Sequence, residues 1–420
     1  MEQVTTHQSA LFEAFKALAN ILASPKLSFV LAAGGLLLML RFRRHVFNWW
    51  IGAFVIFVEA FVVIWGMKDP NFYLIVGKPD NVPITAMLFI STLVLWLAMA
   101  QAVNNDRRVE QKLPPDEKET SNQKTWVWPD LLYIEFIALI ICSFILIFWA
   151  IYLRAPLEQP ANPAATPNPS KAPWYFLGLQ EMLVYYDPWY AGVVLPTFII
   201  VGLMAIPYID INPKGNGYYT FGERKVAITT FLFGYLALWV FMIITGTFLR
   251  GPGWNFFGPF EYWDPHKVVA LNNVNLSDYV WVEFFPWIYR QTHIQWFNQG
   301  LPNVVNKVPQ LIPPDWLSVW LHGVPLKEAF VESSWFTFLV EVGHACKREF
   351  AGILFLLFYF LGLGTALTRT LMKKFYDQMD IGRYLTFVAL VLLMGTLPLK
   401  MVLRWTMNLK YFVDTPWIKF

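Results

Sequence analysis

The sequence predicts an all-α membrane protein with about eight transmembrane helices and a long aromatic-rich outer segment. Three observations lead to this fold class. Hydrophobic residues make up 56% of the 420 positions and charged residues only 15%, whereas a soluble chain carries about 25% charged residues. Several stretches approach the length of about 20 mostly apolar residues that a bilayer-spanning helix needs. Aromatic residues, 18% of the chain, are dense before the last two of these stretches and favour the water–lipid interface.

The apolar stretches define the predicted spans. They cover residues 24–40, 47–67, 82–102, 131–153, 188–208, 226–249, 348–368 and 383–403. The first is the least regular, because Pro25 and Lys26 crowd its start. The last contains Pro398 and Lys400, which predict a kink and a lysine that reaches toward the interface. Residues 11–22 have helical apolar spacing and are expected either to lie on the membrane surface or to pack as a short helix.

Basic residues set the predicted orientation, because cytoplasmic loops are enriched in Lys and Arg. They follow the first, third, fifth and seventh predicted spans, at Arg41, Arg43, Arg44, Arg107, Arg108, Lys112, Lys118, Lys124, Lys214, Arg224, Lys225, Arg369, Lys373, Lys374 and Arg383. The loops 68–81 and 154–187 carry few. Both termini, the loop 154–187 and the segment 250–346 are therefore expected to face outward. If the first span is re-entrant, only the N-terminus changes side.

Several kinds of partner and cofactor are not expected. The net charge is +3 without a long basic run, so no nucleic-acid partner is predicted. Cys142 and Cys346 form neither a haem-attachment motif nor a cluster-binding quartet, and are interpreted as two free thiols. The histidines are His7, His45, His266, His293, His322 and His344, none of them within a predicted span. The chain is therefore expected to hold no transmembrane bis-histidine haem and no metal.

Two outer segments have unusual compositions. The proline-rich run "RAPLEQPANPAATPNPSKAPWY" favours extended polyproline geometry and predicts a rigid strap across the membrane surface. A plain linker is the alternative. The stretch "RGPGWNFFGPFEYWDPH" opens the segment 250–346, which is interpreted as interfacial structure or as a docking surface for a partner.

Three acidic residues are candidates for proton chemistry. Glu59 and Glu135 lie within predicted spans, where each serves either a proton relay or a pairing with a partner helix. Glu181 lies in "KAPWYFLGLQEM", a predicted surface helix on which Trp174, Gly178 and Glu181 share one face. Gly178 would leave room there for a flat ligand. A carboxylate in such an aromatic pocket suits the oxidation of a hydroquinone, which releases protons. A surface glutamate bound to solvent or to a partner arginine is the alternative.

The order of motifs from "APWY" to "MAIPYIDINP" carries a family resemblance. Residues 131–250 resemble the C-terminal part of cytochrome b in quinol:cytochrome c oxidoreductases, which is a separate subunit IV in the plastoquinol-oxidising version. Trp174 and Tyr175 match two residues of the family's Pro-Glu-Trp-Tyr motif. The next span is similar in its entry proline and its closing motif, at Pro196, Pro207, Asp210, Asn212 and Pro213. Residues 348–410 resemble the last spans weakly, and residues 1–120 do not match subunit IV.

One departure from the family motif matters for the chemistry. Pro173 and Ala172 stand where the motif has its glutamate and its leading proline, and that glutamate is thought to take a proton from the quinol. Glu181 is the nearest replacement. Glu181 and Tyr175 are therefore the predicted catalytic residues. The predicted quinol-binding residues are Pro173, Trp174, Tyr175 and Gly178.

The resemblance also implies partners and a location. Haem b would be carried by a cytochrome b N-terminal-type subunit, an iron–sulfur cluster by a Rieske-type protein, and a cytochrome c would be the acceptor. The membrane would be a bacterial inner membrane or an equivalent energy-transducing membrane. The predicted division is an N-terminal extension (1–120), a quinol-site module (121–250), an outer segment (251–346) and the last two spans with the tail (347–420).

Other functions remain open at this stage. A structural scaffold that kept the fold but lost quinol chemistry would explain the missing motif glutamate. A secondary transporter would have internal repeats, which the sequence does not display. A quinone-reducing membrane anchor of another family is the third alternative.

Overall fold

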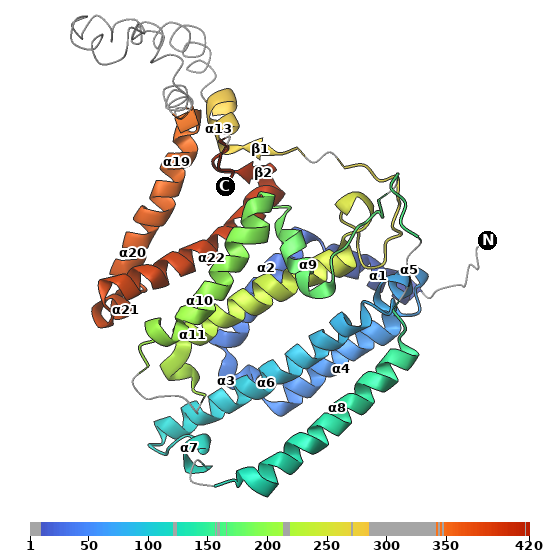
Figure 1. Cartoon of the computed structure of the whole chain (residues 1–420), viewed down its shortest axis with the longest axis vertical. Coiled ribbons are helices and arrows are strands. Elements are labelled where there is room, and N and C mark those ends of the chain that lie inside the picture. The colour runs from blue at the N-terminus through green and yellow to red at the C-terminus, as the bar shows by residue number, and fades with distance from the viewer. Residues whose placement is uncertain are drawn as a thin grey trace, which may run out of the picture. The chain divides into compact units, whose positions relative to one another are not determined.

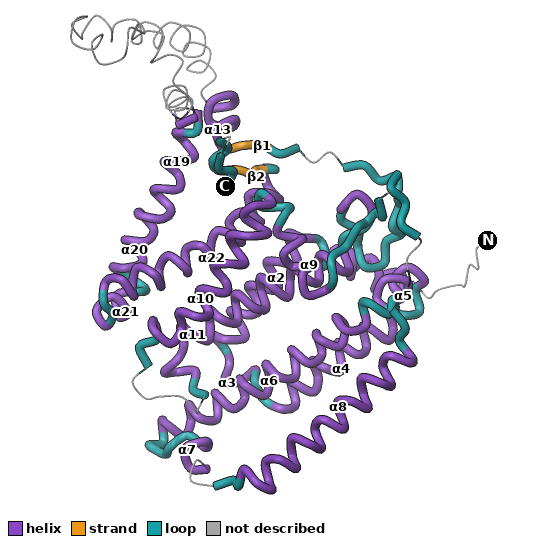
Figure 2. Tube along the Cα trace, viewed as in Figure 1, coloured by secondary structure: helices purple, strands orange, loops and turns teal. Residues whose placement is uncertain are grey.

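A computed structural model describes residues 10–120, 124–155, 157, 160–164, 166–212, 219–269, 272–284, 342, 345–346, 348–415 and 417–420. Helices dominate these residues (Figures 1 and 2), and their one sheet pairs β1 (Val274–Asn275) with β2 (Leu409–Tyr411). The all-α membrane class is confirmed. The described chain divides into unit 1, Met1–Met182 with Asn212–Ala270, and unit 2, Leu183–Ile211 with Leu271–Phe420.

Seven helical runs are long and apolar enough to cross a membrane. In unit 1 they are α4 (Trp49–Gly66), α6 (Val82–Glu110), η1 with α8 (Val127–Leu131 and Leu132–Tyr152), and the run from α11 to η4. That last run comprises α11 (Phe221–Leu232), η3 (Phe233–Val240), α12 (Phe241–Ile244) and η4 (Thr245–Leu249). In unit 2 they are η2 with α10 (Tyr190–Val194 and Leu195–Ile209), α19 to α20, and α22 (Ile381–Met407). The run α19 to α20 comprises α19 (Phe350–Leu357), η8 (Phe358–Leu363) and α20 (Gly364–Arg369).

The first predicted span corresponds to α2 (Pro25–Arg41), which is bent by 80° from α1 (Ala10–Leu22). The two helices together form either an eighth, broken span or a re-entrant pair. Helix α1 is a packing helix: Phe12 is buried, and Phe15 lies 4.7 Å from the Trp65 ring and 5.6 Å from the Phe260 ring. Its Lys16 forms an ion pair with Asp69 at 3.1 Å.

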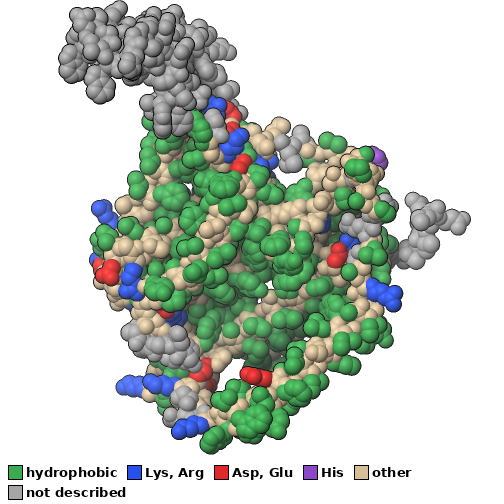
Figure 3. Space-filling view, in the orientation of Figure 1, with side chains coloured by type: hydrophobic (Ala, Val, Ile, Leu, Met, Phe, Trp, Pro, Cys, Tyr) green, Lys and Arg blue, Asp and Glu red, His purple; other side chains and the backbone are tan. Residues whose placement is uncertain are grey.

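Apolar packing joins three of the unit 1 helices. Leu36 and Leu40 of α2, Trp96 and Met99 of α6, and Ile228 of α11 belong to one buried cluster. The short helices of this unit are α3 (Arg43–Val46), α5 (Pro70–Val76), α7 (Asp116–Thr120), α9 (Trp174–Met182) and η5 (Pro252–Trp254). Hydrophobic side chains cover most of the surface visible in Figure 3, as expected of helices that face lipid.

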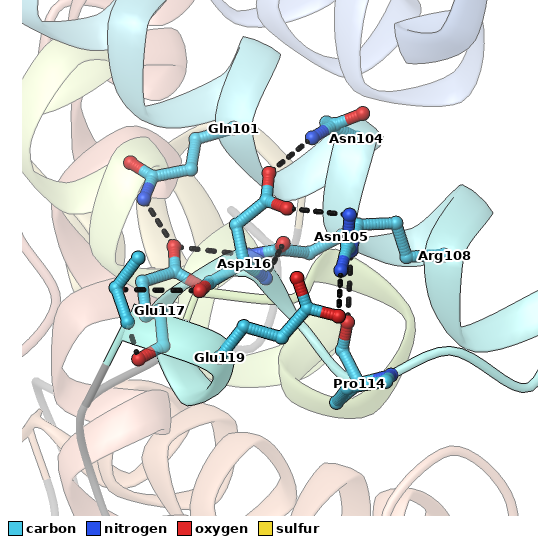
Figure 4. Close-up of polar contacts among 9 residues, drawn as sticks. Gln101, Asn104, Asn105, Arg108, Pro114, Asp116, Glu117 and Glu119 are labelled. Carbon is cyan, nitrogen blue, oxygen red and sulfur yellow. Dashed lines mark hydrogen bonds and ion pairs between the residues drawn. The ribbon is translucent and has the colours of Figure 1, made fainter. Parts of the chain in front are cut away.

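A polar network closes one end of α6 (Figure 4). Arg108 contacts Asp116 and Glu119, each at 2.7 Å. Asn105 donates to Glu117 and also to the carbonyl of Tyr219 at 3.1 Å. Residues 111–120 are therefore folded back onto α6, and the network holds α6 beside the chain that enters α11. This end carries the basic cluster predicted to face the cytoplasm.

Helix α8 differs from the other unit 1 helices in its exposure. None of its residues is buried, and only Trp149 of its side chains is even half-buried. In Figure 1 it runs separately from α4 and α6. Glu135 is exposed on this helix, so both the relay and the partner-helix interpretations of Glu135 stay open.

Unit 2 is organised around α22, which contacts α10 and β2. Its shorter elements are α13 (Leu276–Asp278), η6 (Tyr279–Phe284) and α21 (Lys373–Gln378). Lys400, predicted to reach toward the interface, is only 1% exposed. Its Nζ lies 4.3 Å from the centre of the Tyr186 ring and also above the rings of Phe412 and Phe420. Most of the predicted outer segment 251–346 and of its docking role lies outside the described residues.

Candidate functional site

The proline-rich run reaches α9 as a tethered strap. Residues 166–173 contain no helix or strand. The backbone N–H of Gly253 donates to Asn168 at 2.7 Å, and Gln180 both donates to the Ser170 carbonyl and accepts from the Ala172 N–H, each at 2.8 Å. Asn168 and Gln180 therefore fix this part of the proline-rich run to its surroundings.

Helix α9 begins directly after Pro173 and buries one face. Leu177, Gly178, Glu181 and Met182 form that face, which packs against α12 and η4. A Cβ atom added at Gly178 would lie 3.5 Å from Ile243 and Trp239. Protein side chains therefore occupy the space beside Gly178 that the sequence analysis reserved for a flat ligand.

Glu181 is fully buried in an ion pair with Arg250. Its two carboxylate oxygens accept hydrogen bonds from Arg250 Nη2 at 2.7 Å and Nε at 3.0 Å, and Oε2 also accepts from Trp254 Nε1 at 3.1 Å. A guanidinium that binds a carboxylate through two nitrogens fixes its position and orientation. The sequence analysis offered, as one alternative, a surface glutamate bound to a partner arginine. Glu181 does bind an arginine, but the arginine belongs to this chain and the glutamate is buried.

A cavity of about 1030 Å³ lies at the start of α9. Its walls come from the α5–α6 loop, the end of α8, the strap, the first turn of α9 and residues 261–263. The aromatic lining residues are Trp149, Trp174, Tyr262 and Trp263, and the charged ones are Lys78, Asp80, Lys171 and Glu261. Flat aromatic faces with a few convergent polar groups are typical of a small-molecule site.

The predicted site residues divide between the cavity and its surroundings. Pro173 and Trp174 line the cavity, and Trp174 is 36% exposed. Tyr175 is half-exposed and not part of the lining, although its ring packs edge-on against Trp174 at 5.6 Å. Gly178 and Glu181 lie on the buried face of α9 that packs against α12 and η4, and neither lines the cavity. Nothing about these positions tests the roles of the five residues, which stay predictions.

Lys171 is a cavity residue that the sequence analysis did not single out. Its Nζ donates to the Thr247 carbonyl at 2.7 Å and lies 4.6 Å from the centre of the Trp263 ring. Burial, together with the charge of Lys78, lowers the pKa of Lys171 to about 7. The sequence contained one indication of Lys171: it is a basic residue two positions before Pro173, in a strap with few charges.

Glu261 is the second residue that the sequence analysis missed. It is exposed on the cavity wall, and its Oε2 accepts a hydrogen bond from the Gly258 N–H at 3.0 Å. Glu261 lies beside the strap because the chain that follows η4 folds back toward residues 169–173. No local sequence pattern predicts this long-range contact.

Within the described ranges, no group of three or more His, Cys, Asp or Glu residues is placed to hold a metal ion. Of the histidines in those ranges, His45 lies in α3 and His266 is exposed outside the spans. His7, His293, His322 and His344 lie outside the described residues, so the absence of metal and haem stays a prediction.

Residues 160–249 match the family model described as cytochrome b(C-terminal)/b6/petD. No solved structure matches the chain. The matched segment holds the strap, α9, η2 with α10, and the run from α11 to η4. The resemblance stated from the sequence is confirmed over this segment, of which Pro213 lies outside the described residues. The family indicates a membrane subunit of the cytochrome b/b6f type that works in electron transport within a multisubunit redox complex.

Proposed function

We propose that this chain is a subunit of a cytochrome bc-type quinol:cytochrome c oxidoreductase and forms one wall of its outer quinol oxidation pocket. The observation that carries the proposal is the cavity lined by Pro173 and Trp174, two residues that lie within the family-matched segment 160–249. The chain would carry no haem itself and would not be catalytic alone.

The residues of the cavity fit the head group of a quinol. Trp174 and Trp263 offer flat aromatic faces to a flat ring, and Lys171 and Glu261 offer polar groups to its hydroxyls. The volume is at the upper end of the roughly 300–1,000 Å³ typical of ligand sites. In this proposal the strap and α9 position the ring and exclude water from it, because their hydrogen bonds hold Pro173 and Trp174 in place.

The proposed partners follow from the chemistry of a quinol. A bound quinol supplies two electrons and two protons when it is oxidised. Electrons would leave to haem b on a cytochrome b N-terminal-type subunit and to a Rieske-type iron–sulfur protein, which passes its electron to a cytochrome c. Protons would leave on the outer face of a bacterial inner membrane or an equivalent energy-transducing membrane.

One preparation tests the proposal in two readouts. The tagged chain is isolated gently from membranes, and its reduced-minus-oxidised visible spectrum is recorded with added quinol. We expect a b-type haem signal that quinol reduces. A photoreactive quinone analogue is then expected to label residues 173–177 and to be displaced by excess quinone. A preparation without haem, with every partner retained, would contradict the proposal.

A structural scaffold is the second candidate, and one observation favours it. The motif glutamate is replaced by Pro173, and Glu181 is held by Arg250 on the packed side of α9. A scaffold predicts a haem-containing complex whose residues around Trp174 and Tyr175 bind neither quinone nor a pocket inhibitor. The labelling readout therefore separates the two functions.

A further inference from the structure

The proposed pocket needs a group that accepts a proton, and the family's glutamate is absent from this sequence. Besides Lys78, four charged residues of the described chain are close enough to be considered. Asp80 is half-exposed and paired with Lys78 at 2.7 Å. Glu261 is exposed and accepts the Gly258 N–H. Glu181 is not part of the cavity lining, and both of its oxygens accept hydrogen bonds from Arg250.

Lys171 is the fourth group and differs from the other three. It lines the cavity and is largely buried, and in the described part of the chain it forms no ion pair within 4 Å. Its Nζ is held from two sides, by the Thr247 carbonyl and by the Trp263 ring. Its place in the chain is set by the strap, which also delivers Pro173 to the cavity.

We propose that Lys171, as a neutral amine, is the residue that accepts a proton from the quinol hydroxyl in this cavity. This inference rests on the proposed quinol oxidation. A neutral amine keeps one N–H for the Thr247 carbonyl and has a lone pair for the substrate. In the step, the hydroxyl O–H bond breaks and a new N–H bond forms on Nζ. Oxidation to the quinone also releases the proton of the second hydroxyl, which leaves to solvent, and two electrons, one to an iron–sulfur centre and one to a haem.

The surroundings of Lys171 suit a group that gains and loses its charge. Burial beside Trp263 disfavours the ammonium form, and so do the charges of Lys78 on the α5–α6 loop and Arg250 after η4. Asp80 and Glu181 favour it, and Glu261 adds a further negative charge to the cavity wall. With the pKa of Lys171 lowered to about 7, both forms are present near neutrality, as a reversible proton carrier needs. The exposed Glu261 then offers the proton a route to solvent.

The pH dependence follows with a definite sign. Below about pH 7 the ammonium form of Lys171 dominates and cannot accept a proton, so quinol oxidation is expected to slow as the pH falls. Above about pH 7 the amine dominates and the rate is expected to level off. A carboxylate acceptor with an ordinary pKa near 4 would instead leave the rate flat through this range.

The test compares substitutions that separate charge from basicity. Lys171→Arg keeps a cation for Thr247 and Trp263 but stays protonated at every working pH. We expect it to lower quinol turnover by on the order of 100-fold and to remove the limb near pH 7. Lys171→His restores an acceptor, so part of the activity should return with its limb near pH 6.5.

Lys267→Arg is the matched control. Lys267 also donates to a backbone carbonyl, that of Phe256 at 2.8 Å, and lies over an aromatic ring, that of Phe257 at 4.2 Å, but it does not line the cavity. Its turnover and pH profile are expected to match the wild type. All variants are assayed as the isolated complex, with the haem spectrum and the thermal unfolding temperature recorded to show that the complex is assembled.

The outcomes distinguish a failure of the proposed role of Lys171 from a failure of the proposed quinol oxidation. If the Lys171→Arg complex is assembled and keeps the wild-type turnover and pH limb, the lysine is not the acceptor, although the quinol pocket stands. If the wild-type complex neither oxidises quinol nor takes the quinone label at residues 173–177, the proposed function itself is wrong. An assembled Lys171→His complex as inactive as Lys171→Arg would also overturn the inference.

Discussion

At the residue scale, the ion pair of Glu181 and Arg250 gives a sharp prediction. Arg250→Met removes the guanidinium from a fully buried carboxylate, and breaking a buried pair in this way typically costs about 3–5 kcal/mol. We expect a clear fall in the thermal unfolding temperature of the complex. Replacing both residues with Met should cost less than the sum of the two single changes, because no buried charge is then left behind.

The exposed pair of Arg44 and Glu110 supplies the control for this prediction. Surface pairs contribute about 0–1 kcal/mol, so Arg44→Met should leave the unfolding temperature nearly unchanged. Additive effects of the Glu181 and Arg250 changes would contradict the pairing. Loss of turnover in an assembled Glu181→Gln complex of wild-type stability would instead support the predicted catalytic role of Glu181.

The same residues mark the limit of sequence reasoning at this scale. Helical spacing placed Glu181 on one face with Gly178, and both do lie on the buried face of α9. The spacing could not tell which side of the helix would meet the cavity. That depends on Arg250, which is 69 residues away in the chain and meets Glu181 only after the spans have packed. Lys171 was likewise visible in the sequence, but its burial by Trp263 was not.

At the element scale, substitutions at Gly178 of α9 test whether the ligand binds beside Gly178 or in the cavity at Pro173 and Trp174. A Cβ at Gly178 makes ordinary contact with Ile243 and Trp239 at 3.5 Å, and alanine is the better helix former by about 0.5–1 kcal/mol. Gly178→Ala should therefore keep both stability and KM for quinol. Gly178→Leu overfills the contact and should destabilise the complex by about 1–3 kcal/mol, measured by thermal unfolding. A raised KM in the stable Gly178→Ala complex would show that the ligand lies on the Gly178 face.

The spans were predictable as elements because length and apolar composition are local properties. Seven of the eight predicted spans reappear with shifted ends, and the shifts arise where polar helix ends continue past the apolar part. The segment 82–102, for example, extends to Glu110. There Asn105 and Arg108 form hydrogen bonds and ion pairs with residues of α7. The periodicity of apolar residues does not predict such polar contacts.

At the scale of unit 1, contacts at the two ends of α2 bear on the eighth crossing. At one end, α1 packs on Trp65 and Phe260 and pairs Lys16 with Asp69. At the other end, Arg43 of α3 pairs with Asp106, 3.4 Å apart, and Arg44 pairs with Glu110. The residues that meet α1 end α4 or follow α4 or η4, whereas Asp106 and Glu110 end α6. These are opposite ends of the unit 1 spans, so we expect α2 to run from one membrane face to the other.

This arrangement predicts that the bent pair crosses the membrane, with α1 lying along the outer face. The 17 residues of α2 rise about 25 Å as an α-helix, close to the thickness of about 30 Å of the hydrocarbon core. In a background with Cys142 and Cys346 changed to Ser, we expect Ala10→Cys and Asn162→Cys to react with an impermeant maleimide from the outside of sealed vesicles. Gln111→Cys should react only after permeabilisation. A re-entrant pair would instead make Ala10→Cys behave like Gln111→Cys, while Asn162→Cys, beyond α8, would still report the face that holds the strap and the proposed quinol cavity.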